Sequence, residues 1–564
     1  MIIDARTLSG GEILEGDICI VGAGPAGMTI ARELAGEDCR IFLVESGGFD
    51  LDPATQALTD GVVVGDPYPA LPETRQRRFG GSSHLWEAQA GYKRPGWRCL
   101  PLDPIDFEQR DWIPYSGWPF DRAHLDPFYE RAHQVCQIGP YTYLPEACES
   151  QGAKPLSLTN TQLVTKMSQY GARTPFTDTY RQEIASASNI ETLLYANVIN
   201  LELDSTLQSV NQIHIANLNG SRFSLKAKLV ILATGGIENA RLLLLSNQQQ
   251  TAGLGNQHDL VGRFFMERPI VTCGHLIPAN RRLFGMTGLY DVREIDHYGT
   301  MAWLSLQESV MRQEQLLNSG AQLFPRPKSQ QMKGKKAFRK LVSAVKSGDM
   351  QTAAQSLPPT LKGMDYLAAA SFWSLVRRLP GLQRGDWSYL PFEKSRFSTF
   401  EVIYQLEQAP NPNNRVTLSS EKDTLGQPTS ELHWRLNPID VETVHRVQAI
   451  WQTEFAKAGL GELQLAGDGE ALKFDKLAIH HHMGTTRMHV DPKQGVVDAN
   501  GQVHGVQNLF LTGCSVFPTA GYANPTLTII ALALRLADHV KQRLKNAEVN
   551  LAAATTDSSV NLHK

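Results

Sequence analysis

Apolar and polar positions near the start of the chain follow the order strand, helix, strand. Residues 17–21 form a short apolar run of the kind found in buried parallel strands. Gly-rich residues and an amphipathic stretch at 25–34 follow, and a second apolar run at 40–44 ends on Glu45. About thirty residues with this pattern predict a βαβ unit.

The same buried-strand pattern returns far along the chain. Short β-like runs over 190–232 close on the apolar residues 229–232, and another apolar run occupies 509–511. A helix is predicted over 525–541, with Pro525 in its first turn. Residues 270–475 mix strands and helices without a Gly-rich motif, which predicts a second domain in an α/β protein.

Composition and charge exclude several classes of protein. The chain has 564 residues, of which 42% are apolar, so it can bury cores of two or three domains. The net charge of −3 argues against nucleic-acid binding. The sequence contains no run of 18 apolar residues, so no membrane-spanning helix is predicted. Acidic residues near the N-terminus argue against a signal peptide. Seven scattered cysteines without a CxxC favour a reducing compartment, so we expect a cytoplasmic enzyme.

One segment departs from this average. Residues 326–346 hold eight Lys or Arg and no acid, and Phe338, Leu341, Val342 and Val345 recur at helical spacing. A basic amphipathic helix can lie weakly on a membrane surface or dock a partner. It can also be a solvated lid over an active site.

A glycine fingerprint follows the first predicted strand. Gly22, Gly24 and Gly27 form GxGxxG at the start of the predicted helix. The first glycine permits the tight turn, the second lets the backbone approach a pyrophosphate, and the third lets helix and strand pack closely. Glu45 closes the next strand, where a carboxylate would accept from a ribose hydroxyl. The sequence therefore predicts a dinucleotide site, without choosing between FAD and NAD.

Three further segments carry a more specific signal. They are Arg78-Phe79-Gly80-Gly81-Ser82-Ser83-His84-Leu85-Trp86, the turn at 233–241 (ATGGIENAR), and a C-terminal block that includes 480–488 (HHHMGTTRM) and 521–526 (GYANPT). These segments resemble the glucose–methanol–choline (GMC) oxidoreductases, which bind FAD and oxidise alcohols. Segments 116–119 (SGWP) and 408–412 (QAPNP) are most similar to the bacterial sugar-oxidising branch near pyranose oxidase and fructose dehydrogenase. The resemblance runs from residue 18 to about 540 and is loose in the middle.

The resemblance implies a catalytic pair. The family places a catalytic histidine three positions before the Gly-Thr pair, which here selects His481, and its partner before a proline is Asn524. Imidazole suits a base because its ordinary pKa lies near working pH, whereas Asn can only orient the substrate hydroxyl. Alternation along an extended segment would turn His480 and His482 away from His481, so no metal site is expected.

The resemblance also implies which residues contact FAD. The helix that starts near Pro525 should direct its N-terminus at the flavin, where negative charge develops. Relatives with covalent FAD carry a histidine where this chain has Leu85, and His84 is one place off, so we predict noncovalent FAD. Gly513-Cys514 replaces a segment that often carries an Asp, and Cys514 is expected to be a small packed residue or a reactive thiol. The expected cofactor-binding residues are Gly22, Gly24, Pro25, Ala26, Gly27, Glu45, Ser46, Arg78, Gly80, Gly81, Ser82, Ser83, Leu85, Trp86, Val198, Ala233, Thr234, Gly235, Gly513, Cys514, Pro525 and Thr526.

These expectations combine into one architecture and three candidate functions. A discontinuous, Rossmann-like FAD-binding domain should use residues 10–100, 185–270 and 478–545. An α+β substrate-binding domain and cap should use 101–184 and 271–477, before a disordered tail at 546–564. The favoured function is FAD-dependent oxidation of an alcohol group of a sugar, polyol or glycoside, with oxygen, a quinone or a redox protein as acceptor. A lyase with a non-redox flavin and a noncatalytic FAD-bound scaffold are the alternatives.

Overall fold

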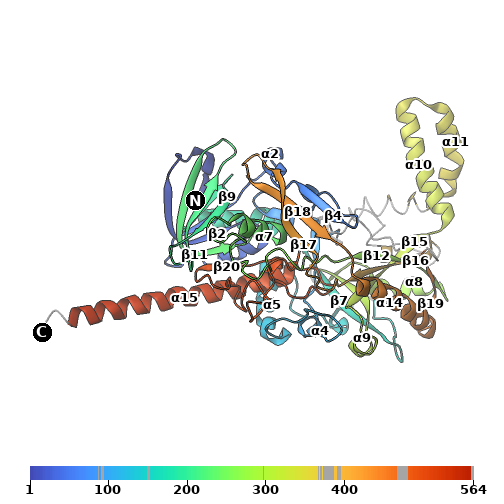
Figure 1. Cartoon of the computed structure of the whole chain (residues 1–564). Coiled ribbons are helices and arrows are strands. Elements are labelled where there is room, and N and C mark those ends of the chain that lie inside the picture. The colour runs from blue at the N-terminus through green and yellow to red at the C-terminus, as the bar shows by residue number, and fades with distance from the viewer. Residues whose placement is uncertain are drawn as a thin grey trace.

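The computed structural model contains two large β-sheets, a small third sheet, and helices that cover the first sheet (Figure 1). The structure describes residues 1–560 apart from 87, 90–94, 149–152, 296–297, 366, 369–370, 372–386, 390–395 and 467–479. All statements below refer to these described residues. Residues 561–564, the end of the predicted tail, lie outside them.

The first sheet has the predicted Rossmann-like organisation. Its order is β1-β8-β3-β2-β11-β10-β9, and β20 pairs with β11. The central pairs β3–β2, β2–β11 and β11–β20 are parallel, as expected for buried apolar strands joined by helices. Its strands are β1 (Ile2–Asp4), β2 (Ile13–Val21), β3 (Ile41–Val44), β8 (Ile190–Leu194), β9 (Asn197–Leu203), β10 (Val210–Ala216), β11 (Arg222–Leu232) and β20 (Leu509–Leu511).

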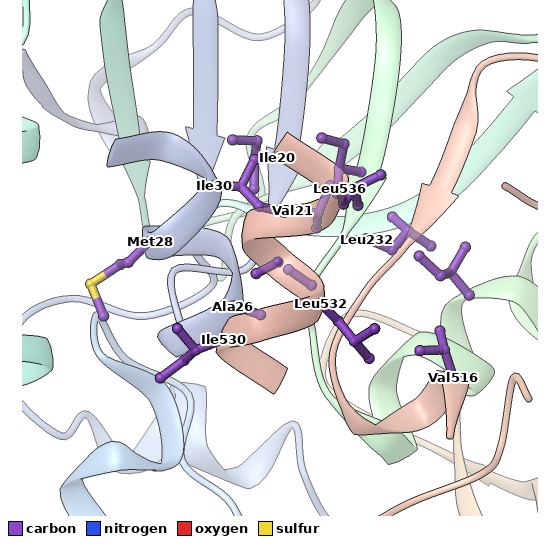
Figure 2. Close-up of a cluster of buried hydrophobic side chains, with 14 of the residues drawn as sticks. Ile20, Val21, Ala26, Met28, Ile30, Leu232, Val516, Ile530, Leu532 and Leu536 are labelled. Atoms are coloured by element: carbon purple, nitrogen blue, oxygen red, sulfur yellow. The ribbon is translucent and has the colours of Figure 1, made fainter. Parts of the chain in front are cut away.

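Helices α1 (Pro25–Glu33) and α15 (Thr526–Val560) pack together beside this sheet (Figure 2). The buried cluster drawn there includes Ile20 and Val21 of β2, Met28 and Ile30 of α1, and residues of α15 such as Ile530. Ile20, Met28, Ile30 and Ile530 are fully buried. Burial of each such side chain favours folding by about 1.5–3 kcal/mol, which fixes both helix N-termini relative to the strand ends.

The second sheet is largely antiparallel, in the order β19-β12-β16-β15-β14-β7-β6-β5, with β13 on β14. Its strands are β5 (Ala88–Gln89), β6 (Pro95–Cys99), β7 (Leu163–Ala172), β12 (Ile270–Pro278), β13 (Arg293–Ile295), β14 (Tyr298–Leu306), β15 (Ser319–Pro327), β16 (Phe397–Leu406) and β19 (Gly461–Leu465). The expected boundary at residue 100 is therefore too late. Strands β5 and β6 pair with β7, because their backbone ladder, and not their position in the sequence, decides the sheet.

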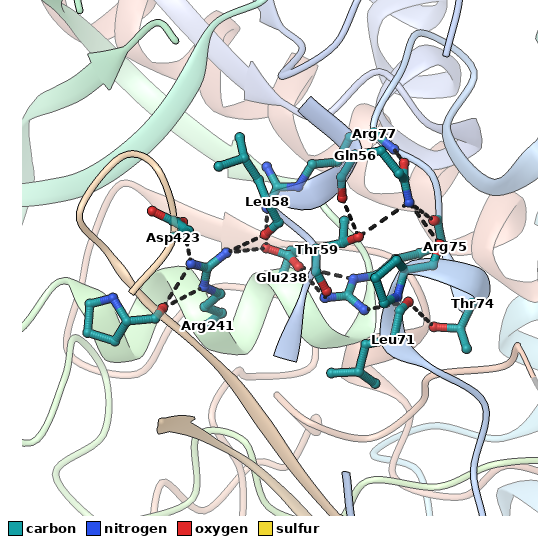
Figure 3. A network of polar contacts seen from close by, with 12 residues as sticks. Gln56, Leu58, Thr59, Leu71, Thr74, Arg75, Arg77, Glu238, Arg241 and Asp423 are labelled. Atoms are coloured by element: carbon teal, nitrogen blue, oxygen red, sulfur yellow. Dashed lines mark hydrogen bonds and ion pairs between the residues drawn. The ribbon is translucent and has the colours of Figure 1, made fainter. Parts of the chain in front are cut away.

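A three-stranded sheet pairs a strand near the N-terminus of the chain with two strands from residues 415–434. Strand β4 (Gly61–Gly65) pairs in parallel with β18 (Pro428–Trp434), which pairs with β17 (Arg415–Lys422). Beside it, Glu238 at the start of α7 (Gly236–Leu245) lies among three arginines (Figure 3). Its carboxylate accepts from Arg75 at 2.8 Å and from Arg77 at 2.5 Å, and Arg241 lies 3.6 Å away. Arg241 also binds Asp423 at 2.7 Å, so the network connects α7 with the β17–β18 loop.

A helical hairpin and the C-terminal helix extend away from the sheets in Figure 1. Helices α10 (Ser329–Ser347) and α11 (Met350–Lys362) form a hairpin that projects from the second sheet, and α10 covers most of the predicted basic helix. Helix α15 continues to Val560, through the segment expected to be a disordered tail. No described helix is both long and apolar enough to cross a membrane.

The remaining α-helices are mostly short and occupy connections between strands. They are α2 (Pro53–Ala57), α3 (Leu71–Thr74), α4 (Pro104–Phe107), α5 (Arg122–Cys136), α6 (Tyr180–Ser186), α8 (Leu283–Met286), α9 (Glu308–Glu314) and α14 (Pro438–Lys457). Helix α5 packs on α15 and extends the helical layer over the first sheet.

Candidate active site

A cavity of about 770 Å³ lies between the carboxyl ends of the first sheet and one face of the second sheet. Its volume is within the usual range of ligand sites. The glycine fingerprint lies at one end, and the three consecutive histidines and Asn524 also line it. The cavity thus unites segments that are 500 residues apart in the chain.

The geometry at each of the three fingerprint glycines is compatible with its predicted role. Gly22 has a φ of +102°, in the left-handed region that favours glycine. Gly24 lines the cavity, and a Cβ added there would meet no atom within 4 Å, so a ligand can approach the backbone. A Cβ on Gly27 would lie 1.9 Å from the Gly22 carbonyl oxygen, so this glycine allows close packing and does not reach the cavity.

Glu45 closes β3 at the predicted place and is buried. One carboxylate oxygen accepts from the Ala23 N–H at 2.9 Å, and the other accepts from the Gly47 N–H at 2.9 Å and the Ser46 hydroxyl at 3.1 Å. These bonds leave lone pairs on the carboxylate, which lines the cavity. Glu45 is therefore positioned both to fix the turn and to accept from a ribose hydroxyl.

Most of the other predicted cofactor residues also line the cavity. Arg78 and Gly80 do not: Arg78 donates to Gln76 at 2.8 Å, and Gly80 has a φ of +93° in the turn before the Ser-Ser segment. The lining residues are Pro25, Ala26, Ser46, Gly81, Ser82, Ser83, Leu85, Trp86, Val198, Ala233, Thr234, Gly235, Gly513, Cys514, Pro525 and Thr526. These predicted residues thus lie on the cavity wall, and Gly27, Arg78 and Gly80 do not line it.

Local contacts bear on two of the sequence alternatives. Cys514 Sγ donates to the His482 carbonyl oxygen at 3.1 Å, and burial raises the pKa of this thiol to about 12, which disfavours the reactive thiolate. Leu85 lines the cavity, whereas His84 does not and faces the Phe79 carbonyl oxygen at 3.0 Å. The side chain at the position of covalent attachment is thus aliphatic.

The predicted catalytic pair lies together in the cavity. Asn524 Nδ2 is 3.4 Å from His481 Nε2. Arg98 Nε donates to Asn524 Oδ1 at 2.7 Å, which orients the amide so that its NH₂ group faces the imidazole. Because an amide NH₂ can only donate, Nε2 of His481 is the unprotonated nitrogen, and its one lone pair accepts this long bond when no substrate hydroxyl lies between the two groups. This nitrogen can take a proton from a substrate hydroxyl.

Glu267 is a buried carboxylate behind the histidines. It accepts from the His481 backbone N–H at 3.0 Å and from the Tyr68 hydroxyl, and burial raises its pKa to about 7. Nδ1 of His481 and Nε2 of His482 each lie 3.9 Å from its oxygens. Glu267 thus holds the backbone of the predicted base in place.

The expected alternation of the histidines is wrong. His480, His481 and His482 all line the cavity, and the rings of His481 and His482 both face Glu267. The reason is that residues 480–482 do not form a strand, so the period of two does not apply. His482 is buried and its ring lies 5.8 Å from that of Phe265, as expected for a packed residue. The described residues hold no cluster of three or more side chains suited to a metal.

Burial lowers the pKa of His481 well below its ordinary value, and the charges of Arg268 and Arg98 and the neighbouring histidines add to this. The imidazole is therefore neutral at working pH. A neutral imidazole is the form that can act as a base.

The opposite wall comes from the second sheet and was missed by sequence reasoning. It carries two buried arginines, Arg98 and Arg268, the glutamines Gln322 and Gln405, and aromatic and aliphatic side chains such as Trp303. Arg268 donates to Gln405, and the Arg98 guanidinium lies 3.9 Å from the Trp303 ring centroid. Only Glu267-Arg268 had a sequence signal, as two charges within an apolar run.

The residues present fit FAD. The N-termini of α1, α7 and α15 all contribute lining residues, so backbone N–H groups and positive dipole ends face the cavity. Buried polar atoms without a hydrogen-bond partner within the described chain include Arg98 Nη1, Trp97 Nε1 and His481 Nδ1. A ligand with a pyrophosphate, a ribose and a polar ring can pair with such groups.

Comparisons with known proteins agree with this geometry. The family profile described as GMC oxidoreductase, for the C-terminal region, matches residues 410–533. The chain is 23% identical to 6'''-hydroxyparomomycin C oxidase of Streptomyces lividus, over 94% of this chain and 92% of that protein. It is 26% identical to the fructose dehydrogenase large subunit of Gluconobacter japonicus, over 57% of this chain and 48% of that subunit. The alignments cover about half the length of two of the curated relatives.

The fold of the chain is also similar to that of a solved structure. A crystal structure of formate oxidase superimposes with a TM-score of 0.52 at 18% identity, over 96% of this chain and 100% of that chain. The dinucleotide sheet, the antiparallel second sheet and the cavity between them are thus arranged as in a known fold. Residues 410–533 are therefore similar to the C-terminal region of GMC oxidoreductases, and the fold of the chain is similar to that of formate oxidase.

Proposed function

We propose that this protein oxidises an alcohol group of a sugar, polyol or glycoside to a ketone or aldehyde, using noncovalent FAD. The observation that carries the proposal is the position of His481 and Asn524 in the same cavity as the glycine fingerprint. Bound FAD supplies a hydride acceptor. The relatives named above are a 6'''-hydroxyparomomycin C oxidase and a fructose dehydrogenase large subunit, and the second name supports a carbohydrate-like substrate.

In the proposed reaction, Nε2 of His481 takes the hydroxyl proton of the substrate. Asn524 donates to that hydroxyl oxygen from its NH₂ group, whose direction is set by Arg98. Glu267 holds the His481 backbone, so the imidazole needs little reorganisation during proton transfer. A positioned base contributes about 10²–10⁴-fold to the rate.

The wall formed by the second sheet supports a substrate with several hydroxyl groups. Gln322, Gln405 and Arg268 place amide and guanidinium groups among apolar side chains such as Trp303 and Phe324. Buried hydrogen-bonding groups select against substrates that leave them unpaired. A sugar or polyol, with hydroxyls on a small carbon frame, meets this requirement better than a simple aliphatic alcohol.

The test is anaerobic mixing of the holoenzyme with a panel of sugars, glycosides, diols and aliphatic alcohols. Bleaching of the flavin band by sugars or glycosides supports the proposal. Substrate cleavage without bleaching would indicate a lyase, and no response across the panel would indicate a noncatalytic FAD-bound protein. Re-oxidation of the bleached enzyme with oxygen, a quinone or a redox protein then identifies the acceptor.

A further inference from the structure

The helical hairpin of α10 and α11 is packed with its small side chains inside and large apolar side chains outside. Between the two helices, a Cβ added at Gly334 would lie 2.6 Å from the Gly363 Cα atom. The other buried positions on the hairpin are also small or polar: Gln331, Ala337, Ala344, Ala353, Ser356 and Thr360. A helix pair in water normally buries its large apolar residues. The outward-facing apolar residues of this pair are therefore suited to contact with another apolar surface.

The exposed apolar residues form one stripe on each helix. On α10, Phe338, Val342 and Val345 follow the i, i+4, i+7 spacing and are 44%, 38% and 59% exposed. On α11 and just beyond it, the corresponding stripe has the spacing i, i+7, i+11, i+14, and its members are at least 47% exposed. These members are Met350, Leu357, Leu361 and Met364.

Both stripes lie on the same side of the hairpin. Viewed from the N-terminus of its own helix, each stripe is rotated by about a quarter turn in the same sense from the buried small residues. For two antiparallel helices, equal rotations in this sense point to one common side. We call this side, formed by Phe338, Val342, Val345, Met350, Leu357, Leu361 and Met364, the apolar hairpin face.

Positive charge borders the apolar hairpin face. Helices α10 and α11 contain seven Lys or Arg and no Asp or Glu. Lys335, Arg339 and Lys346 follow the helical spacing i, i+4, i+11 and form the row next to the apolar stripe of α10. Lys and Arg on the polar side with Phe and Leu on the other are typical of helices that lie in the interface of a membrane.

We propose that the apolar hairpin face docks on the surface of an anionic lipid bilayer. Anionic headgroups complement the basic row, and the aliphatic and phenyl side chains enter the acyl boundary. A protein partner fits less well, because protein interfaces are depleted in Lys, and five of the basic residues on α10 are Lys. The hairpin projects from the body (Figure 1), so it can reach a flat surface.

Vesicle binding by the full-length holoenzyme tests the proposal. We expect co-sedimentation with phosphatidylcholine vesicles that contain phosphatidylglycerol, weaker binding at high salt, and little binding to phosphatidylcholine alone. The variant Phe338→Ser/Val345→Ser/Leu361→Ser should bind at least tenfold more weakly with unchanged FAD content. A matched control, Leu144→Ser/Met286→Ser/Val490→Ser, changes three exposed apolar residues elsewhere and should bind like the parent. Absence of binding to anionic vesicles, or equal binding by both triple variants, would overturn the proposal and leave a protein partner as the occupant.

A site-specific probe gives a second readout that does not depend on the triple variants. Six of the seven native cysteines are buried and Cys514 is half-buried, so an exposed new cysteine can be labelled selectively. With an environment-sensitive dye on Val345→Cys, anionic vesicles should increase and blue-shift the emission. The same dye on Val490→Cys, an exposed site outside the hairpin, should not respond. Equal responses at the two sites, or none at Val345→Cys, would contradict docking through this face.

Discussion

The amide nitrogen of Asn524 lies 3.4 Å from Nε2 of His481, although the two residues belong to different segments of the C-terminal block. Arg98, from β6 in the second sheet, fixes the direction of that amide through a 2.7 Å bond. The orientation of the predicted base therefore depends on both sheets. The following predictions start from this arrangement.

The variant His481→Ala should keep its FAD and its visible spectrum but lose flavin reduction by substrate. The expected decrease in the rate is about 10²–10⁴-fold, the usual contribution of a positioned base. His480→Ala and His482→Ala should lose much less, because only His481 has a ring nitrogen facing Asn524. Anaerobic stopped-flow reduction of the three variants decides the matter. A dead His480→Ala or His482→Ala beside an active His481→Ala would place the base elsewhere.

The rate of flavin reduction should fall only in acid. Burial and nearby positive charge hold the pKa of His481 well below 6.5. The neutral, proton-accepting form therefore persists as pH decreases through 6.5, and activity is lost only when pH approaches the lowered pKa. The measurement is the anaerobic reduction rate between pH 5 and pH 9 at saturating substrate. An acid limb at or above pH 7 would contradict the environment described for His481.

Replacement of Arg98 should act through Asn524. In Arg98→Gln the amide loses its orienting donor, so the reduction rate should decrease by an amount similar to that in Asn524→Ala. In the double variant the two losses should not add, because residues of one hydrogen-bonded unit are coupled. A double-mutant cycle on the anaerobic reduction rate measures this coupling. Fully additive losses would show that Arg98 affects the reaction by a route independent of Asn524.

Replacement of Glu45 should weaken FAD binding more than chemistry. Glu45→Ala removes the acceptor of two backbone N–H groups and one predicted ribose contact. A lost bond to a charged group costs about 1.5–3 kcal/mol, or roughly 10–150-fold in the dissociation constant. Reconstitution of the apoprotein with FAD gives that constant, and Glu12→Ala, at an exposed site, is the control. Parent-like affinity in Glu45→Ala would remove Glu45 from the site.

Replacement of Glu267 should change how stability depends on pH. The pKa of Glu267 is raised to about 7 from an ordinary value of 4.5, so the folded protein binds the proton more tightly than the unfolded chain. Its contribution is fully present below pH 4.5 and is lost as pH rises through 7, by on the order of 3 kcal/mol. Glu267→Gln lacks this loss, so its melting temperature relative to the parent should increase from pH 5 to pH 8. Exposed Glu421→Gln should show no such trend, and a pH-independent difference for Glu267→Gln would refute the assignment.

The parts of the site that the sequence predicted are those with a local signature. The glycine fingerprint, Glu45 and the motif blocks act through backbone turns that a few adjacent residues determine, so they could be located before any fold was known. Arg98 and Trp303 come from strands, and Arg268 from the segment just before β12; the neighbours of these strands are set by long-range pairing, and no short motif marks the three residues. The alternation argument failed at the histidines because it assumed a strand that residues 480–482 do not form.

The position of β20 determines when during synthesis the cofactor site can be completed. This strand, at residues 509–511, pairs with β11, and the helix after it brings Pro525 and Thr526 to the cavity. Gly22 and Gly24 leave the ribosome at the start of translation but meet these residues only at its end. Domains whose contacts span most of the chain fold slowly and expose partly built cores. The N-terminal βαβ unit must therefore wait for almost the whole polypeptide, and a chain that terminates before β20 cannot form a complete FAD site.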